Sequence, residues 1–365
     1  MVVHSLPRSA MAAAAALVVT ASTASVAVLP AQAREHRVGN TFREVRLVAD
    51  QPGHAATTDP NLVNAWGLAF GPTTPLWVSN NGTSTSTLYQ GAMPGKSITK
   101  VPLVVKIPGG GAPTGVVFNP TPGFGLSTGG KTGKSLFIFA GENGDISAWN
   151  QSGDPMKAVL VAHTPNAVYK GLTMVTTGGV HFLLAADFHN DRIAMFNQRF
   201  HRVSRPNAFP SRGIPAGYAP FDVARLGSRV YVTYAQQDAA RHDDVAGPGH
   251  GFINVFTQSG RFLRTLVSRG VLNSPWGLAI APRGFEPFAG KLLVGNFGNG
   301  RIHVVNRRTG QVVATLQNAA HKPIVVDGLW ALLPGNGVAG ARSDVWFSAG
   351  PGGEAHGLLG ILRHP

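Results

Sequence analysis

A pattern of about 50 residues recurs six times along this chain, and it limits the possible folds more than any other feature. Each copy opens with a Gly-Leu-like strand start and a polar or Gly/Pro turn. A β-branched or aromatic strand follows, ends in small, acidic or amide residues, and leads into a third strand. The first and fifth copies, residues 64–82 and 273–305, agree best. The strand starts lie near residues 67, 115, 171, 221, 277 and 328.

Repeats of this length are typical of β-propeller blades. A single blade cannot bury both of its faces, whereas a closed ring buries each blade against its neighbours. A β-sandwich has no reason to repeat at this period, and the coils of a β-helix are much shorter. The pattern therefore predicts an all-β protein, a six-bladed β-propeller with four-stranded antiparallel blades.

A ring of blades closes only if the two ends of the chain meet in one sheet. Residues 44–48, with the sequence Glu-Val-Arg-Leu-Val, can supply an early strand for this purpose. We therefore expect them to complete the blade that ends in residues 358–362. A second interpretation stays open, in which residues 41–59 hold a degenerate extra blade.

Residues 1–33 have the organisation of an export signal. Arg8 precedes an Ala/Val-rich apolar stretch at residues 10–29, and Ala31-Gln32-Ala33 matches a small-x-small cleavage site. We predict cleavage before Arg34, a single propeller domain over residues 34–365, and a secreted protein without a membrane span. The alternative is a retained membrane anchor, because the apolar stretch is nearly long enough to cross a bilayer.

The chain contains no cysteine, which excludes cysteine-based catalysis and thiolate metal sites. Its formal net charge of +14 favours anionic partners such as wall polymers or acidic polysaccharide. The basic residues are scattered, however, and not interleaved with aromatic residues in runs, so we expect no nucleic-acid partner. The charge is also compatible with a surface that only keeps a monomer soluble.

The propeller fold predicts where a ligand site would lie. The first strand of each blade lines the channel, and the turn after the second strand returns to the face where the first strand began. Strand starts and second-strand ends should therefore form one polar funnel. The residues predicted to bind a ligand there are Asn64, Trp66, Asn81, Tyr218, Trp276, Asn296 and Trp330. The alternative is that the asparagines serve as turn residues and that Trp66 and Trp276 pack between blades.

Carboxylates and imidazoles on the same face suggest acid–base or metal chemistry. The catalytic candidates are Asp187, His189, His242, Asp243, Glu354 and His356. The candidate ligands of a divalent cation, such as Ca²⁺ or Mg²⁺, are Glu142, Asp187, Asp243 and Glu354. The densest acidic stretch, residues 238–244, lies in a long loop of the fourth blade and could equally be a loop braced by Arg241.

Five segments, residues 185–190, 216–221, 234–238, 242–249 and 354–358, resemble an uncharacterised family of exported bacterial β-propeller proteins. Their clearest motifs here are Ala216-Gly217-Tyr218-Ala219-Pro220-Phe221 and His242-Asp243-Asp244-Val245-Ala246-Gly247-Pro248-Gly249. That family is distantly similar to NHL-type and gluconolactonase-like six-bladed propellers. The resemblance implies a propeller and export, and it transfers no activity. The metal-ligand pattern of gluconolactonase-like proteins is not reproduced here residue by residue.

Three functions remain open from the sequence. The first is a propeller that binds a small molecule or carbohydrate at the funnel. The second is a metal-assisted enzyme of the lactonase or lyase type, which predicts a compact acidic and histidine cluster at the axis. The third is a protein-interaction scaffold, which predicts a broad basic face without a pocket. The first of these functions, a ligand-binding propeller, predicts exposed aromatic rings in a groove.

Overall fold

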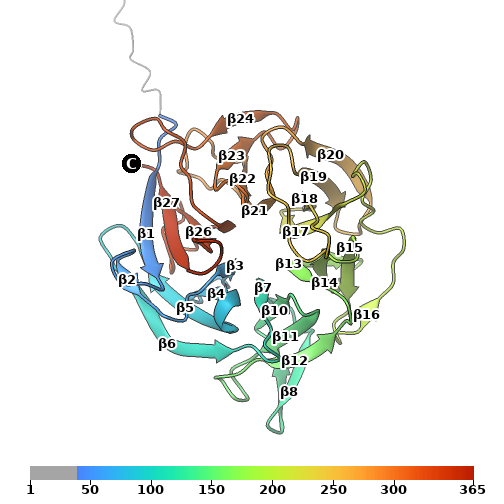
Figure 1. Cartoon of the computed structure of the whole chain (residues 1–365). Helices are drawn as coiled ribbons and strands as arrows, with labels where there is room; N and C mark the ends of the chain where they lie inside the picture. Colours follow the sequence, from blue (N-terminus) through green and yellow to red (C-terminus); the bar gives the residue numbers. More distant parts are fainter. Residues whose placement is uncertain (1–38) are drawn as a thin grey trace, which may run out of the picture. The chain divides into compact units, whose positions relative to one another are not determined.

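The computed structural model describes residues 39–365, which form a ring of six sheets around a central axis, with all strand pairs antiparallel except β1 and β2 (Figure 1). This confirms the predicted six-bladed propeller. The predicted signal at residues 1–33 and its cleavage site lie outside the described residues and stay predictions. Within residues 39–365, no helix is long and apolar enough to cross a membrane.

Five of the sheets are each built from consecutive segments of the chain. The first contains β3 (Ala65–Ala69), β4 (Leu76–Asn80), β5 (Thr85–Gly91) and β6 (Ile98–Lys106), with the short 3₁₀ helix η1 (Asn81–Thr83) after β4. The second contains β7 (Pro113–Phe118), β10 (Phe137–Gly141), β11 (Asp145–Trp149) and β12 (Val159–His163), and the hairpin of β8 (Gly125–Thr128) and β9 (Lys131–Lys134) is inserted between its first two strands. The third contains β13 (Tyr169–Thr177), β14 (Val180–Asp187), β15 (Arg192–Phe196) and β16 (Arg202–Val203).

The remaining blades follow the same order. The fourth contains β17 (Tyr218–Leu226), β18 (Arg229–Gln236), β19 (Phe252–Thr257) and β20 (Phe262–Ser268). The fifth contains β21 (Pro275–Ile280), β22 (Leu292–Asn296), β23 (Ile302–Val305) and β24 (Val312–Thr315). The sixth contains β25 (Leu329–Pro334), β26 (Val345–Ala349) and β27 (Leu358–Arg363), together with β1 (Arg43–Ala49) and β2 (Thr57–Thr58).

The sixth blade closes the ring in the predicted way. β1 pairs with β27 in antiparallel register, with Glu44 opposite Leu362 and Val48 opposite Leu359. Residues 41–59 therefore contribute β1 and β2 to the sixth sheet, and the alternative of an extra blade is wrong. Closure in one sheet leaves the ring without an open seam, which suits a chain that has no disulfide to hold its ends.

The recurring glycine at the strand starts has a packing role. Gly67, Gly115 and Gly171 lie on the innermost strands of the first three blades. A Cβ atom at any of these positions would collide with the innermost strand of the next blade, for example with the backbone of Leu172 in the case of Gly115. The glycines therefore allow adjacent inner strands to approach closely around the axis.

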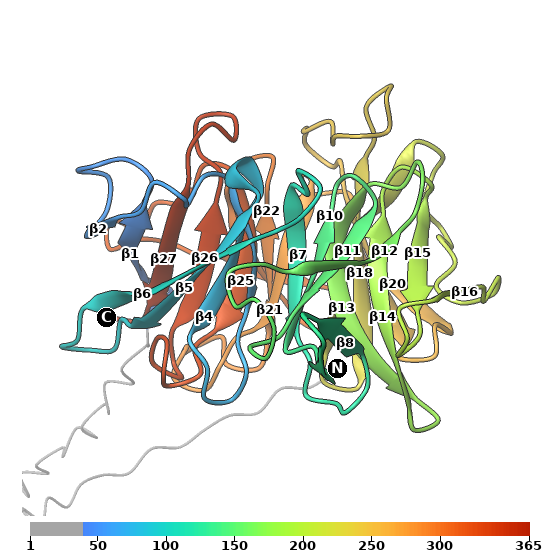
Figure 2. The same ribbon diagram turned by 90° about the horizontal axis from the view of Figure 1, so that it is seen from below.

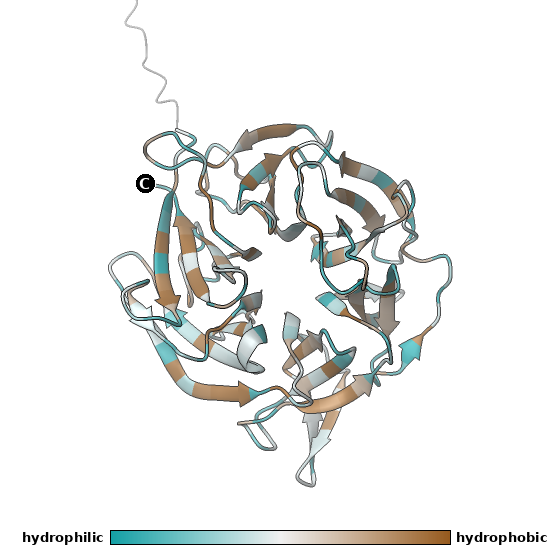
Figure 3. Ribbon diagram, in the orientation of Figure 1, coloured by the Kyte–Doolittle hydropathy of each residue, from teal (hydrophilic) through white to brown (hydrophobic). Residues whose placement is uncertain are grey.

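The hydrophobic core lies between neighbouring blades. Trp77 of β4 in the first blade stacks on Phe137 of β10 in the second, with ring centroids 4.2 Å apart. Strands of the blades are largely apolar, whereas many of the loops that join them are hydrophilic (Figure 3). Because each blade buries both faces in this way, the loops at the two ends of the channel are left to carry polar function.

Candidate functional site

Three polar segments gather on one face of the ring, as the sequence predicted. They are η1, the β18–β19 loop (residues 237–251) and the β26–β27 loop (residues 350–357), which rise on the same side in Figure 2. The β18–β19 loop is the extended loop of the fourth blade that the sequence singled out. A polar face at the mouth of the channel results.

Lys170, on β13, is the centre of this face. Its side chain is only 2% exposed. The Lys170 Nζ forms an ion pair with the Glu142 Oε1, donates to the Asp243 Oδ1 at 2.9 Å, and lies 5.2 Å from the ring centroid of Trp66. Lys170 directly precedes the strand start that the sequence predicted near residue 171, but it was not selected as a site residue. The sequence does contain a signal for Lys170: it is a lone charged residue between Val168-Tyr169 and Gly171-Leu172, in a segment that is otherwise apolar.

Amides extend the network from Lys170 across the first and sixth blades. The Glu142 Oε2 accepts a hydrogen bond from the Asn81 Nδ2 at 2.8 Å. The Asn64 Nδ2 donates to the Asn81 Oδ1 at 3.2 Å and to the Glu354 Oε2 at 2.6 Å. The connected side chains, with His242 added through Asp243, are called the axial cluster below: Asn64, Asn81, Glu142, Lys170, His242, Asp243 and Glu354.

His242 and Asp243 reach the cluster because the β18–β19 loop folds over the channel. The Asp238 carboxylate accepts hydrogen bonds from the backbone N–H groups of His242, at 2.8 Å, and Asp243, at 3.3 Å. The His242 Nδ1 lies 3.0 Å from the Asp243 Oδ1. One potential ligand atom from each of Glu142, His242 and Asp243 lies within 4.8 Å of the others, an arrangement that could hold a metal ion.

Burial and charge set the protonation of the cluster. Burial lowers the pKa of Lys170, but the carboxylates of Glu142 and Asp243 outweigh it and raise that pKa above its usual value. Burial raises the pKa of Asp243, yet the charge of Lys170 prevails and the pKa is lowered. Burial also raises the pKa of Glu354, and the negative charge of Glu142 adds to this effect. Glu354 therefore takes up a proton more readily than an ordinary glutamate, whereas Lys170 and Asp243 stay charged.

Three tryptophans support the axial cluster from inside the channel. Trp66, Trp276 and Trp330 are 1%, 5% and 1% exposed. Trp66 stacks on Trp330 at a centroid distance of 3.5 Å, and Trp276 meets both rings edge-on. The Trp330 Nε1 donates to the Asn64 Oδ1 and the Trp276 Nε1 to the Lys170 carbonyl oxygen, each at 3.0 Å. The sequence left open that Trp66 and Trp276 pack between blades, and the structure agrees with that alternative. The rings are buried and orient polar residues, and they do not form the groove of exposed aromatic rings expected of a binding protein.

Other sequence candidates lie apart from the axial cluster. Asp187 is buried and accepts hydrogen bonds from the Arg192 Nε and the Asn190 Nδ2, each at 2.9 Å. His189 is partly exposed in the turn after β14. The His356 Nδ1 lies 3.0 Å from the Asp50 Oδ2.

Two of the predicted ligand-binding residues have structural contacts of their own. Tyr218 packs edge-on against Phe252, with ring centroids 5.0 Å apart. The Asn296 Nδ2 donates to the Val271 carbonyl oxygen at 2.8 Å. Of the predicted residues, the structure thus unites Asn64, Asn81, Glu142, His242, Asp243 and Glu354, with the tryptophans beneath them.

Comparisons with known proteins give relatives but no activity. No family model matches the sequence. The chain is 32% identical to the uncharacterized protein R648 of Acanthamoeba polyphaga mimivirus, over 89% of this chain and 81% of that protein. It is also 32% identical to the uncharacterized protein L690 of the same virus, over 88% and 86%. These relatives are viral, so they do not support the bacterial origin expected from the resemblance.

Solved structures agree with the fold. The streptogramin B lyase structure matches 89% of this chain and 97% of its own with a TM-score of 0.50 and 12% identity. The soluble aldose sugar dehydrogenase of Escherichia coli matches 88% and 99% with a TM-score of 0.53 and 13% identity. At this level of identity, the similarity establishes the propeller fold alone.

Proposed function

Since this chain belongs to the same family as the mimivirus proteins R648 and L690, whose names carry no activity, we propose a function from its own residues: the axial cluster binds a small, neutral, hydroxyl-rich molecule such as a carbohydrate. The observation that carries the proposal is the convergence of polar side chains from five blades around the buried ammonium of Lys170. In small-molecule sites a few convergent polar groups fix the orientation of the ligand, and the mouth of a closed β structure is one of the places where such sites occur.

The cost of the cluster argues that it serves a purpose beyond folding. Removing an ammonium and a carboxylate from water costs several kcal/mol per ion, and their attraction repays this only with good geometry. A well-packed apolar contact would stabilise the channel at least as well. The chain nevertheless places Lys170, Glu142 and Asp243 at this point, where they fix the positions of Asn81 and His242.

The charge of the site favours hydroxyl groups over anions. The axial cluster contains three acidic residues, which are Glu142, Asp243 and Glu354. The neighbouring Asp244 also interacts with the charge of Lys170, so acidic groups outnumber this ammonium at the site. An acceptor-rich site binds donors, which sugar hydroxyls supply and a carboxylate or phosphate does not. Of the carbohydrate and anionic ligands that the sequence suggested, the axial cluster therefore favours the carbohydrate, although the whole chain carries a net charge of +14.

This proposal predicts selective stabilisation by neutral sugars. We expect glucose, maltose or cellobiose to raise the melting temperature by a few degrees at saturating concentration, because a ligand of the folded state stabilises it by mass action. Glucuronate and inorganic phosphate should give no rise. Glu354→Gln and Asp243→Asn should abolish the response, whereas Asp154→Asn, at an exposed carboxylate outside the axial cluster, should retain it. Equal stabilisation by glucuronate, or none by any sugar, would contradict the proposal.

A metal-assisted enzyme is the second candidate, favoured by the proximity of Glu142, His242 and Asp243. A cation bound there would share Asp243 with the ammonium of Lys170, which donates to the Asp243 Oδ1 at 2.9 Å and would repel it. With a metal in place, the carboxylates and the imidazole would hold it while it polarised a substrate oxygen. Lys170 thus competes with the ion for the same carboxylates.

A metal series decides between these candidates. We expect Ca²⁺, Mg²⁺, Mn²⁺, Zn²⁺ and EDTA to leave the melting temperature of the wild-type protein unchanged, because Lys170 already forms ion pairs with Glu142 and Asp243 and repels a second cation. In Lys170→Met the same carboxylates are free, and a divalent ion should raise the melting temperature by replacing the lost charge. A rise in the wild-type protein that disappears in Glu142→Gln would instead support the metal-assisted enzyme.

A further inference from the structure

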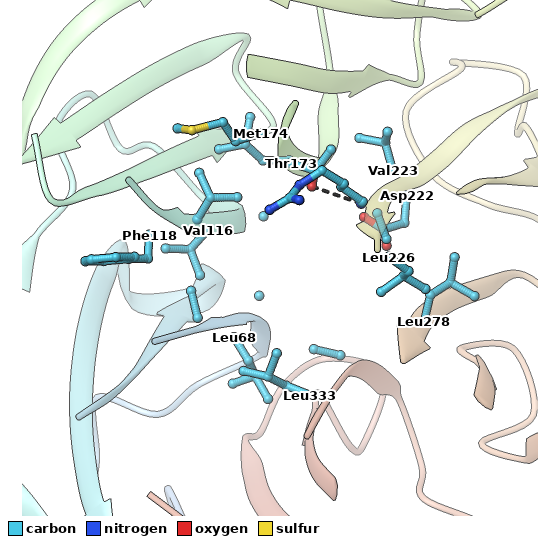
Figure 4. Close-up of a pocket in the computed structure, with 18 of the residues that line it drawn as sticks. Leu68, Val116, Phe118, Thr173, Met174, Asp222, Val223, Leu226, Leu278 and Leu333 are labelled. Atoms are coloured by element: carbon cyan, nitrogen blue, oxygen red, sulfur yellow. Dashed lines mark hydrogen bonds between the residues drawn. The ribbon is translucent and has the colours of Figure 1, made fainter. Parts of the chain in front are cut away.

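A cavity lies at the opposite end of the ring axis from the axial cluster. It has a volume of about 440 Å³. Its wall is formed by the later residues of the six inner strands, whereas the axial cluster lies at their beginnings. Figure 4 shows its largely apolar lining, which includes Leu68, Val116, Phe118, Met174, Val223, Leu226, Leu278 and Leu333.

The tryptophans separate this cavity from the axial cluster. Trp276 lines the cavity and meets Trp66 and Trp330 edge-on, and all three rings are buried. The cavity is therefore a separate compartment with its own lining. A volume of this size lies within the range of about 300–1,000 Å³ that is usual for small-molecule sites.

Asp222, on β17, is the acidic group in this apolar wall (Figure 4). The residue is 6% exposed, and its backbone N–H donates to the Thr233 Oγ1 at 2.9 Å. Gly171 makes room for it, because a Cβ at that position would collide with the Asp222 carboxyl group. Among residues 39–365, no lysine, arginine or histidine forms an ion pair with Asp222; its carboxyl group is hydrogen-bonded by the Val223 backbone.

The surroundings of Asp222 leave its charge without compensation. Burial raises the pKa of its carboxyl group to about 7. The other titratable side chains that line the cavity are His181 and Arg225. A buried carboxylate of this kind is stabilised by a cation brought close to it.

We propose that this cavity binds a small apolar molecule that carries an amine, with the ammonium group at Asp222 and the hydrocarbon part against the leucine and valine side chains. Charge complementarity at Asp222 selects the amine, because a neutral or anionic head group leaves the charge of this carboxylate uncompensated; the ammonium lies at Asp222 and not beside the Arg225 guanidinium of the same lining. The apolar body contributes through burial of its surface. This site is independent of carbohydrate binding at the axial cluster.

Three probes of equal chain length test the proposal: n-octylamine, n-octanol and octanoate. Binding to the purified full-length protein is measured by isothermal titration calorimetry at pH 8, above the raised pKa of Asp222, where octylamine is protonated. We expect octylamine to bind at least tenfold more tightly than octanol and octanoate. Equal binding of octylamine and octanoate, or no binding of octylamine, would overturn the proposal.

Two variants separate the contributions of charge and cavity. Asp222→Asn keeps the shape of the side chain and should remove at least tenfold of the octylamine affinity without reducing octanol binding. Leu333→Trp places a larger side chain at the partly exposed wall and should reduce binding of both octylamine and octanol. Val313→Trp, on the exposed surface of β24, is the matched control and should bind as the wild-type protein does. Unchanged octylamine affinity in either Asp222→Asn or Leu333→Trp would also overturn the proposal.

Discussion

Lys170→Met is expected to lower the free energy of unfolding by about 3–5 kcal/mol, because it leaves two carboxylates near one another without their cation. The side chains of Lys170 and Glu142 are 2% and 14% exposed, so water can solvate the Glu142 carboxylate little once the ammonium is removed, whereas Asp243 is 64% exposed and contributes less to the loss. The partners of the ammonium, Glu142 and Asp243, come from two other blades. Urea denaturation of the purified protein at pH 7 measures the change.

A triple variant is the control for this prediction. When Glu142→Gln and Asp243→Asn are added to Lys170→Met, neither partner of the lost ammonium is still a carboxylate, and most of the lost stability should return. The pH gives a further check. Since the pKa of Lys170 is raised in the folded protein, its stabilising contribution is complete below the unfolded pKa of about 10.4 and is lost as the pH rises through the folded value. A loss below about 1 kcal/mol for Lys170→Met would show that the ion pairs contribute little.

Trp330→Ala is expected to cost about 3–5 kcal/mol of unfolding free energy, the usual effect of removing a buried tryptophan. Trp330 is 1% exposed and stacks between Trp66, at 3.5 Å, and Phe297, at 4.0 Å. Its removal leaves a cavity on the propeller axis, where rings from several blades meet and cannot collapse together easily. Thermal and urea denaturation measure the loss.

Trp330→Phe separates packing from hydrogen bonding. It keeps an aromatic ring between Trp66 and Phe297 but removes the N–H that donates to the Asn64 Oδ1. We expect a smaller loss of stability, with about 1–3 kcal/mol arising from the unsatisfied Asn64 oxygen, and a weaker response to sugars because Asn64 also donates to Glu354. Equal losses in the alanine and phenylalanine variants would mean that stacking contributes little.

Much of the propeller could be predicted because its pattern is local. The six strand starts with their recurring glycine and the closure of β1 on β27 were predicted from short segments, whereas the close approach that these glycines allow was seen in the structure. The polar face was predicted as well, since strand direction alone decides at which end of the channel a turn lies. The same reasoning selected Glu142, Asp243 and Glu354 by residue type and position.

The sequence did not indicate which of these residues meet. Lys170 and Asp243 are 73 residues apart, and Asn64 and Glu354 are 290 apart, yet each pair is hydrogen-bonded. The same selection also included Asp187 and His356, which have partners elsewhere. Residue type and loop position cannot distinguish these cases, because the distances depend on how the blades are rotated about the axis.

By itself, the sequence thus determined the class of fold, the number of blades, the closing strand and the polar face, because each follows from periodicity and from strand direction. Only the tertiary structure decided that Lys170 is the centre of the axial cluster, that the tryptophans pack beneath it and that Asp222 lines an apolar cavity. The physical reason is that burial and charge compensation are properties of the closed ring. They arise when side chains distant in sequence meet at the axis, and a pattern of about 50 residues contains no record of them.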